Sequence, residues 1–123
     1  MPSRALGEFE QLILLALVAL PPEECYGVPI RELIEQRTGR ALSAGAVYTA
    51  LDRLTARGFV SSALGEPTAE RGGRRKRMYH LETAGARELA RSVRTLQGMS
   101  EGLLPQLELR LAGTTARSSG KRR

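Results

Sequence analysis

The uninterrupted apolar run LILLALVAL at residues 12–20 constrains the fold more than any other feature of this sequence. It ends at Pro21 and Pro22, and proline cannot continue a helix, so we predict a first helix from about Gly7 to Leu20. A helix that is apolar nearly all round must be covered on several sides. The run is far shorter than the roughly 20 residues that span a bilayer. We therefore expect a buried helix, not a membrane segment or a signal peptide.

The chain is basic, and its excess charge is localised. Its 123 residues suit one small domain with an appended helix. Nineteen Lys and Arg against thirteen Asp and Glu give a net charge of +6. Residues 37–94 alone hold twelve Lys and Arg against five Asp and Glu, a net charge of +7. Such localisation favours nucleic acid over a membrane surface as the partner. Because the core of so small a domain is marginal, a second copy that shares apolar surface is also expected.

Residues that could carry catalysis or bind metal are scarce. Cys25 is the single cysteine and His80 the single histidine. This predicts no metal site and no disulfide, with Cys25 a small buried hydrophobe in a reducing cytoplasm. No carboxylate pair, activated nucleophile or phosphate-binding glycine loop has the spacing that catalysis needs. The sequence therefore predicts no catalytic residues and no cofactor, and it disfavours an enzyme.

Two further helices follow the first, with a short break between them. An apolar stripe predicts a helix over about residues 28–37, and Gly39 stands where a left-handed residue ends a helix. Ser43 is a good cap for a third helix over residues 43–57, which Gly58 then ends. The order helix, short break, capped helix is typical of a helix-turn-helix.

The third predicted helix has two unlike faces. Its apolar side chains recur at helical spacing and should pack inward: Val47, Ala50, Leu51 and Leu54. The other face carries Gly45, Tyr48, Thr49, Asp52 and Arg53. A helix of this size fits the major groove of B-DNA, which is about 12 Å wide. Asp52 is the exception, because a carboxylate repels phosphate. It either accepts a hydrogen bond from a cytosine amine or, as we favour, pairs with Arg53 or Arg57 and orients them.

Two extended segments at residues 59–64 and 76–81 follow, joined by a basic connector. Gly72 and Gly73 would let this connector bend close to DNA while its cations reach a minor groove. The alternative is a solvated basic surface. We predict a wing over residues 65–77 that contacts DNA through Arg71, Arg74, Arg75, Lys76 and Arg77.

These elements together predict a mostly α fold with a small β-hairpin wing, a winged helix-turn-helix followed by a C-terminal dimerisation helix. The capped start of the third helix can offer backbone amides to a phosphate. Besides the wing, the predicted DNA-binding residues are Arg40, Ser43, Gly45, Tyr48, Thr49, Asp52, Arg53 and Arg57.

From about Thr83, apolar residues return at steps of three and four, which predicts a final helix with one uncovered stripe. Pro105 should break or kink this helix at Leu104, after Gly98 and Gly102 have weakened the preceding turns. The uncovered stripe, together with the first helix, predicts a dimer interface of Leu12, Leu15, Leu89, Val93, Leu96, Met99 and Leu103.

Three regions follow from these patterns. We expect a winged helix-turn-helix DNA-binding domain at residues 1–82 and a C-terminal dimerisation helix at residues 83–111, with a kink or break at Pro105. The remainder, residues 112–123, is polar and basic and is expected to be a disordered tail.

Three stretches, GEFEQLILLAL, YGVPIRELIEQRTGRALSAGAVYTALDRLTARGFV and RMYHLETAG, closely resemble the winged-helix domain of PadR-type bacterial transcriptional regulators over about residues 7–86. The resemblance implies a homodimeric repressor in which the first and C-terminal helices form the interface, and in which Ser43, Tyr48 and the wing arginines approach DNA. A lone C-terminal helix is similar to the shorter branch of the family.

The sequence also departs from the family pattern. Ala44 and Thr49 stand where members often carry proline, and LETAG at residues 81–85 stands where Leu-Thr-x-x-Gly is usual. Some relatives bind flat aromatic drugs between tryptophans in the dimer cleft, and this chain has no Trp.

The leading hypothesis is a cytoplasmic homodimeric repressor. It would read a pseudo-palindromic site on double-stranded DNA, with helix 43–57 in the major groove and the 65–77 wing near the minor groove. Two alternatives stay open at this point. One is a winged-helix module that binds an acidic protein partner, and the other is a sensor gated by a small-molecule effector at the dimer cleft. No membrane partner is expected.

Overall fold

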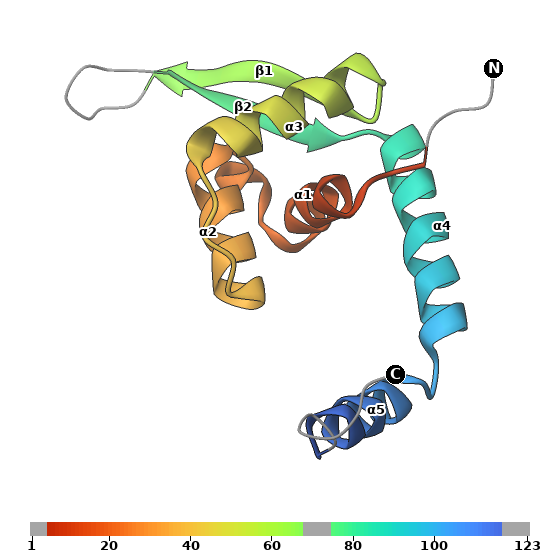
Figure 1. The fold of residues 1–123 in the computed structure, drawn as a ribbon. Helices are drawn as coiled ribbons and strands as arrows, with labels where there is room; N and C mark the ends of the chain where they lie inside the picture. The colour runs from red at the N-terminus through yellow and green to blue at the C-terminus, as the bar shows by residue number, and fades with distance from the viewer. Residues whose placement is uncertain (1–4, 68–74, 117–123) are drawn as a thin grey trace. The chain divides into compact units, whose positions relative to one another are not determined.

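The computed structural model describes residues 5–67 and 75–116 (Figure 1). Its elements, in chain order, are α1 (Glu8–Ala19), the 3-10 helix η1 (Pro22–Glu24), α2 (Gly27–Thr38), α3 (Ala44–Ala56), β1 (Val60–Pro67), β2 (Arg75–Leu81), α4 (Thr83–Ser100) and α5 (Leu104–Ala116). The predicted fold class, mostly helical with one hairpin, is confirmed. The chain divides into two units, Met1–Ser92 and Val93–Arg123, and α4 runs from the first into the second.

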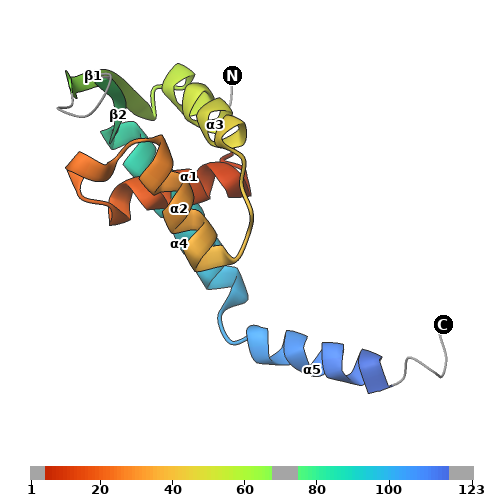
Figure 2. The same ribbon diagram turned by 90° about the vertical axis from the view of Figure 1, so that its left-hand side faces the viewer.

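The core of the first unit lies where α1, α2 and α3 meet (Figure 2). Its largest fully buried side chains are Ile13, Leu14, Ile30, Val47, Leu51 and Leu54. Burying each of these contributes about 1.5–3 kcal/mol relative to leaving it in water. The predicted inner face of the third helix is therefore confirmed, and the opposite face of α3 is left to solvent.

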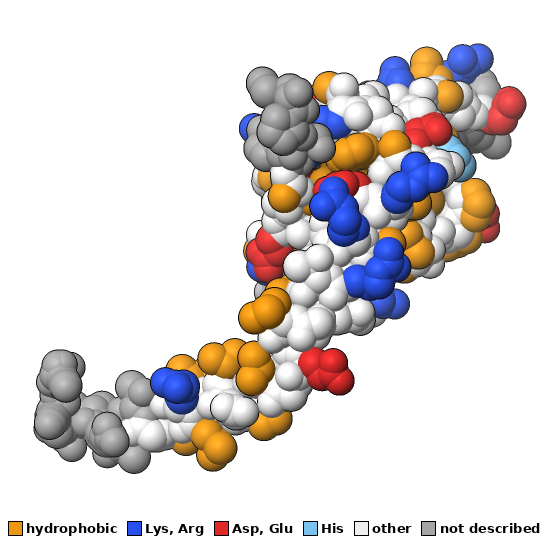
Figure 3. Space-filling view, turned by 90° about the vertical axis from the view of Figure 1, so that its right-hand side faces the viewer, with side chains coloured by type: hydrophobic (Ala, Val, Ile, Leu, Met, Phe, Trp, Pro, Cys, Tyr) orange, Lys and Arg blue, Asp and Glu red, His pale blue; other side chains and the backbone are white. Residues whose placement is uncertain are grey.

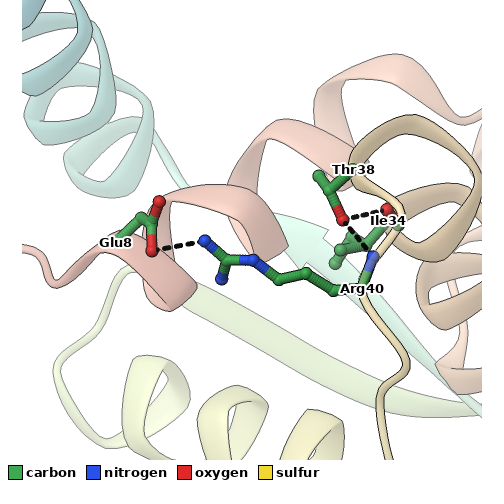
Figure 4. Close-up of polar contacts among 4 residues, drawn as sticks. All are labelled: Glu8, Ile34, Thr38 and Arg40. Carbon is green, nitrogen blue, oxygen red and sulfur yellow. Dashed lines mark hydrogen bonds and ion pairs between the residues drawn. The ribbon is translucent and has the colours of Figure 1, made fainter. Parts of the chain in front are cut away.

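The turn between α2 and α3 is fixed by several local contacts. Gly39 ends α2 with φ 75°, the left-handed conformation that its position predicted. Glu35 Oε2 accepts a hydrogen bond from the Leu42 amide at 2.7 Å. Thr38 Oγ1 donates to the Ile34 carbonyl at 2.7 Å and accepts from the Arg40 amide at 3.2 Å (Figure 4). These bonds hold the chain in one path as it enters α3.

Strands β1 and β2 form an antiparallel hairpin, in register from Val60 opposite Leu81 to Leu64 opposite Arg77. The register shifts between Leu64 and Pro67, and pairing resumes with Pro67 opposite Arg75. Both strands therefore extend into the segment that the sequence predicts as a connector. The remainder of that segment, including Arg71 and Arg74, lies outside the described residues.

The C-terminal region, predicted as a helix over residues 83–111 with a kink or break at Pro105, contains two separate helices. Helix α4 ends at Ser100, and Gly102 follows with φ 75°, a conformation that ends helices readily. The break therefore comes at Gly102, before the predicted position. Pro105 lies in the first turn of α5, where its missing N–H has no partner to lose.

Helix α5 extends further than predicted, and its leucines are exposed. Residues 112–116, expected as part of a disordered tail, are helical, whereas residues 117–123 lie outside the described part. The resemblance implies a lone C-terminal helix, whereas the structure has two. Figure 3 shows hydrophobic side chains exposed along α5, where the exposed leucines are Leu104, Leu107, Leu109 and Leu111. No helix within residues 5–67 and 75–116 is long and apolar enough to cross a membrane.

Candidate nucleic-acid interface

Helix α3 presents its polar face to solvent. Ser43 caps the helix as predicted, because its Oγ accepts a hydrogen bond from the Ala46 amide at 3.0 Å. The polar-face residues predicted from the sequence are all exposed: Gly45, Tyr48, Thr49, Asp52 and Arg53. Because the opposite face of α3 is buried, the helix cannot rotate, and these side chains stay on its solvent-facing side.

Tyr48 does not project freely from this face, because its ring lies over the first turn of α2. A Cβ atom added at Gly27 would lie 2.1 Å from Tyr48 Oη and 2.4 Å from its Cζ. The first turn of α2 contains no acidic residue, and its N-cap Tyr26 makes no side-chain cap hydrogen bond. The amides at a helix start have no partners within the helix and carry partial positive charge. The Tyr48 hydroxyl therefore lies beside a surface that favours anions.

The hairpin adds cations to this region. Lys76 Nζ lies 4.5 Å from the centre of the Tyr26 ring, a cation–π contact beside the start of α2. Arg77 Nη1 donates to Ser62 Oγ at 3.0 Å across the hairpin, and its side chain is exposed, as is that of Arg75. Of the five predicted wing cations, these three lie within the described residues.

The pKa of Tyr79, on β2, depends on two residues of α3. Burial is the main reason that the pKa of its phenol is raised above the ordinary value, and the negative charge of Asp52 and the Tyr48 phenol raise it further. The positive charge of Arg77 lowers the same pKa. Asp52 is exposed, and its charge nevertheless raises the pKa of a tyrosine that is buried on β2.

The pairing that we favoured for Asp52 is wrong in this structure. The ion pairs among the described residues are Arg40–Glu8, Arg57–Glu10 and Arg91–Glu88. None of them includes Asp52. Asp52 is exposed on the polar face, and acceptance from a base amine is its remaining predicted role.

Two of the predicted DNA-binding arginines are engaged within the protein. Arg40 Nη2 lies 2.8 Å from Glu8 Oε1 (Figure 4). Arg57, only 18% exposed, lies 3.6 Å from Glu10 Oε1 and stacks 4.6 Å above the Phe59 ring. The acidic start of α1 thus pairs with Arg40 in the turn before α3 and with Arg57, the C-cap of α3. Arg57 therefore does not belong to the polar face of α3. The sequence signal for this ion pair was Glu10, because a carboxylate so close to the apolar run needs a positively charged partner.

The predicted dimer residues divide into three groups. Leu89 is only 5% exposed in the single chain, so it belongs to the core, and its prediction as a dimer residue is wrong. Leu12 and Val93 are partly exposed. The others are open to solvent: Leu15, Leu96, Met99 and Leu103. Leu12 and Leu15 also line an apolar groove of about 300 Å³ between α1 and α2.

Three packed helices followed by a hairpin, with a solvent-facing polar face on the third helix, define a winged helix-turn-helix, a DNA-binding class. The model of the PadR-like transcriptional regulator family matches residues 14–91. The chain therefore belongs to the PadR-like family and is a DNA-binding transcriptional regulator.

Solved structures agree with this assignment. A transcriptional regulator from Thermoplasma acidophilum is 27% identical, with a TM-score of 0.59 over 79% of this chain and 91% of that one. A PadR family regulator from Clostridium difficile is 20% identical, with a TM-score of 0.63 over 80% and 98%. A PadR-like regulator from Bacillus cereus is 22% identical, with a TM-score of 0.58 over 80% and 89%. The last two establish similarity of fold alone. A search of curated proteins found no significant match.

Proposed function

We propose that the protein is a homodimeric transcriptional repressor that reads a pseudo-palindromic operator with α3 in the major groove. The observation that carries this proposal is the polar face of α3, which is capped, exposed and backed by a fully buried apolar face. Arg53 would fork onto a guanine or grip a phosphate, and Thr49 would donate to a base or contact a thymine methyl. Asp52 would accept from a cytosine amine.

The start of α2 is proposed to hold the DNA backbone. The amides of Gly27 and Val28, the Tyr48 hydroxyl and the Lys76 ammonium lie in one region, and all of these groups can donate to a phosphate oxygen. Phosphate contacts fix the register of a protein on the duplex and carry no sequence information themselves. This surface would therefore set the depth and direction in which α3 enters the groove.

The hairpin is proposed as a wing that approaches the neighbouring minor groove. Arg75 and Arg77 are exposed on β2, and Arg71 and Arg74 belong to the same basic segment of the sequence. Arginine is attracted to narrow minor grooves by their enhanced negative potential. The wing would thus add salt-dependent affinity to the selectivity provided by α3.

The dimer is proposed to form through apolar side chains that the single chain leaves uncovered. Residues 1–82 would bind DNA, and the helices after them would carry most of the interface. Leu96 and Met99 are 65% and 71% exposed on α4, while Leu15 is exposed beside the α1–α2 groove. A marginal core gains from sharing such surfaces with a second copy.

Selection of bound duplexes from a random DNA pool, followed by footprinting, tests the proposal. We expect enrichment of an inverted repeat whose half-sites are centred about 34 Å apart, one turn of B-DNA. A single unrepeated half-site would contradict the dimeric arrangement. No enriched sequence at moderate salt would contradict base reading altogether and would favour an acidic protein as the partner.

A further inference from the structure

Tyr48, on the polar face of α3, packs closely against Gly27 at the start of α2. Gly27 is buried, whereas Tyr48 is 41% exposed. The space that a Cβ would fill at Gly27 is occupied by the tyrosine hydroxyl at 2.1 Å, Cζ at 2.4 Å and Cε1 at 3.0 Å. Cβ atoms in proteins essentially never approach a non-bonded heavy atom of a distant residue closer than 3.0 Å. The observed position of the Tyr48 ring therefore requires a residue without a Cβ at position 27.

We propose that Gly27 is a positioning residue for DNA recognition, because it admits the Tyr48 ring against the first turn of α2 and so fixes the direction of the tyrosine hydroxyl. Gly27 does not need to touch DNA to have this effect. The inference rests on the proposed function, in which Tyr48 contacts DNA. It also explains why α2 begins with a glycine.

The backbone at Gly27 has no other evident need for glycine. Its φ is not among the positive values, which occur at Gly39, Gly58 and Gly102. As the first residue of α2, it could be alanine at no conformational cost, because alanine is the best helix former. The glycine is explained by the space that Tyr48 takes, and not by the backbone of its own helix.

The obstacle at Gly27 is the far end of a flexible side chain, so Gly27→Ala should fold and relieve the clash by rotating Tyr48 away. We expect this variant to bind operator DNA about tenfold more weakly, which is similar to the expected loss for Tyr48→Ala. The double variant Gly27→Ala/Tyr48→Ala should bind no more weakly than Tyr48→Ala alone, since the ring that Gly27 positions is already gone. Gly113→Ala, at an α5 glycine with open space around it, is the matched control.

The experiment combines this binding cycle with NMR of the Tyr48 ring in the full chain. The Tyr48 ring resonances should shift in Gly27→Ala and stay in place in Gly113→Ala. Unmoved resonances in Gly27→Ala would overturn the proposal, and so would equal losses of affinity from Gly27→Ala with and without Tyr48. If Tyr48→Ala binds operator as the wild type does, the proposed role of Tyr48 fails and the inference falls with it. If Tyr48→Ala weakens binding while Gly27→Ala does not, only the inference fails.

Discussion

Gly85 lies where helix α4 begins against the turn that joins α3 to the hairpin. A Cβ at this position would lie 2.3 Å from the Phe59 carbonyl oxygen and 3.0 Å from Leu81 Cδ1. In contrast to Gly27, the nearest obstacle is backbone, which cannot rotate away. The same carbonyl accepts a hydrogen bond from the Glu82 amide at 2.9 Å, so moving it would disturb the start of α4 as well.

Gly85→Ala should therefore lower the free energy of unfolding by about 1–3 kcal/mol, the usual cost of an overpacked site. Urea unfolding followed by circular dichroism measures this loss. Gly98→Ala, in the same helix with nothing near its Cβ position, is the control and should be neutral or stabilising. Equal unfolding midpoints for Gly85→Ala and the wild type would show that the close approach is absent in solution.

Tyr79 should make the stability of the protein depend on pH in the alkaline range. Burial, Asp52 and Tyr48 raise the pKa of its phenol above the ordinary value of 10.0, so the native state resists deprotonation. This contribution to stability is complete below pH 10 and is lost as the pH rises from there through the raised pKa. Urea unfolding from pH 8 to 11 should show a steeper decline for the wild type than for Tyr79→Phe. Parallel curves would contradict the shift.

At the scale of elements, the acidic start of α1 joins α1 to α3. Glu10 is buried, receives a hydrogen bond from the Gly7 amide at 3.0 Å and pairs with Arg57 at the end of α3. Glu8 pairs with Arg40 before α3, but that contact is exposed on both sides. The two pairs differ in burial, so they should differ in energy.

Glu10→Ala should lower the free energy of unfolding by about 1–3 kcal/mol, because it removes a buried carboxylate that accepts from the Gly7 amide and pairs with Arg57. Glu8→Ala should cost less than about 1 kcal/mol, as exposed ion pairs usually do. A double-mutant cycle of Glu10→Ala with Arg57→Ala, measured by urea unfolding, should give a non-zero coupling energy. Strictly additive losses would mean that the two side chains act independently.

Local signals allowed most element boundaries to be predicted from the sequence. Gly39 and Gly58 end their helices in the left-handed conformation, and Ser43 caps α3, as their residue types indicated. The break between α4 and α5 was misplaced, because Pro105 is a strong helix breaker only in a helix interior and here it occupies a first turn.

The polar face of α3 could be predicted as well, because helical spacing decides which residues share a face. The contacts that orient this face could not. The partners of Arg57 and the role of Gly27 depend on how α1 and α2 pack on α3, and no local pattern encodes the distance between side chains so far apart in sequence.

At the scale of the whole molecule, exposed apolar side chains remain on both units. In the Val93–Arg123 unit they include Leu96, Met99 and the leucines of α5. Monomeric proteins rarely leave contiguous apolar surface open to water, and such surface usually marks an interface. In the proposed dimer, these side chains would be buried against the second copy of the chain.

The double variant Leu96→Glu/Met99→Glu should therefore dissociate the proposed dimer, because it places charge in an apolar interface. Sedimentation equilibrium should give about twice the chain mass of 13.4 kDa for the wild type and the single-chain mass for the variant. Arg94→Glu, on the opposite face of α4 by helical spacing, should leave the mass unchanged. A wild-type mass of one chain at micromolar concentration would contradict the dimer.

The central claim is that the polar face of α3 reads base pairs, and Arg53→Ala tests it most directly. Fluorescence anisotropy with operator and scrambled duplexes at fixed salt gives a selectivity ratio for each protein. We predict that Arg53→Ala weakens operator binding by about 1–3 kcal/mol with little change on scrambled DNA, so the ratio falls. Arg87→Ala, an exposed arginine on α4, should leave the ratio unchanged. Equal weakening of Arg53→Ala on both duplexes, or no weakening on either, would contradict the account.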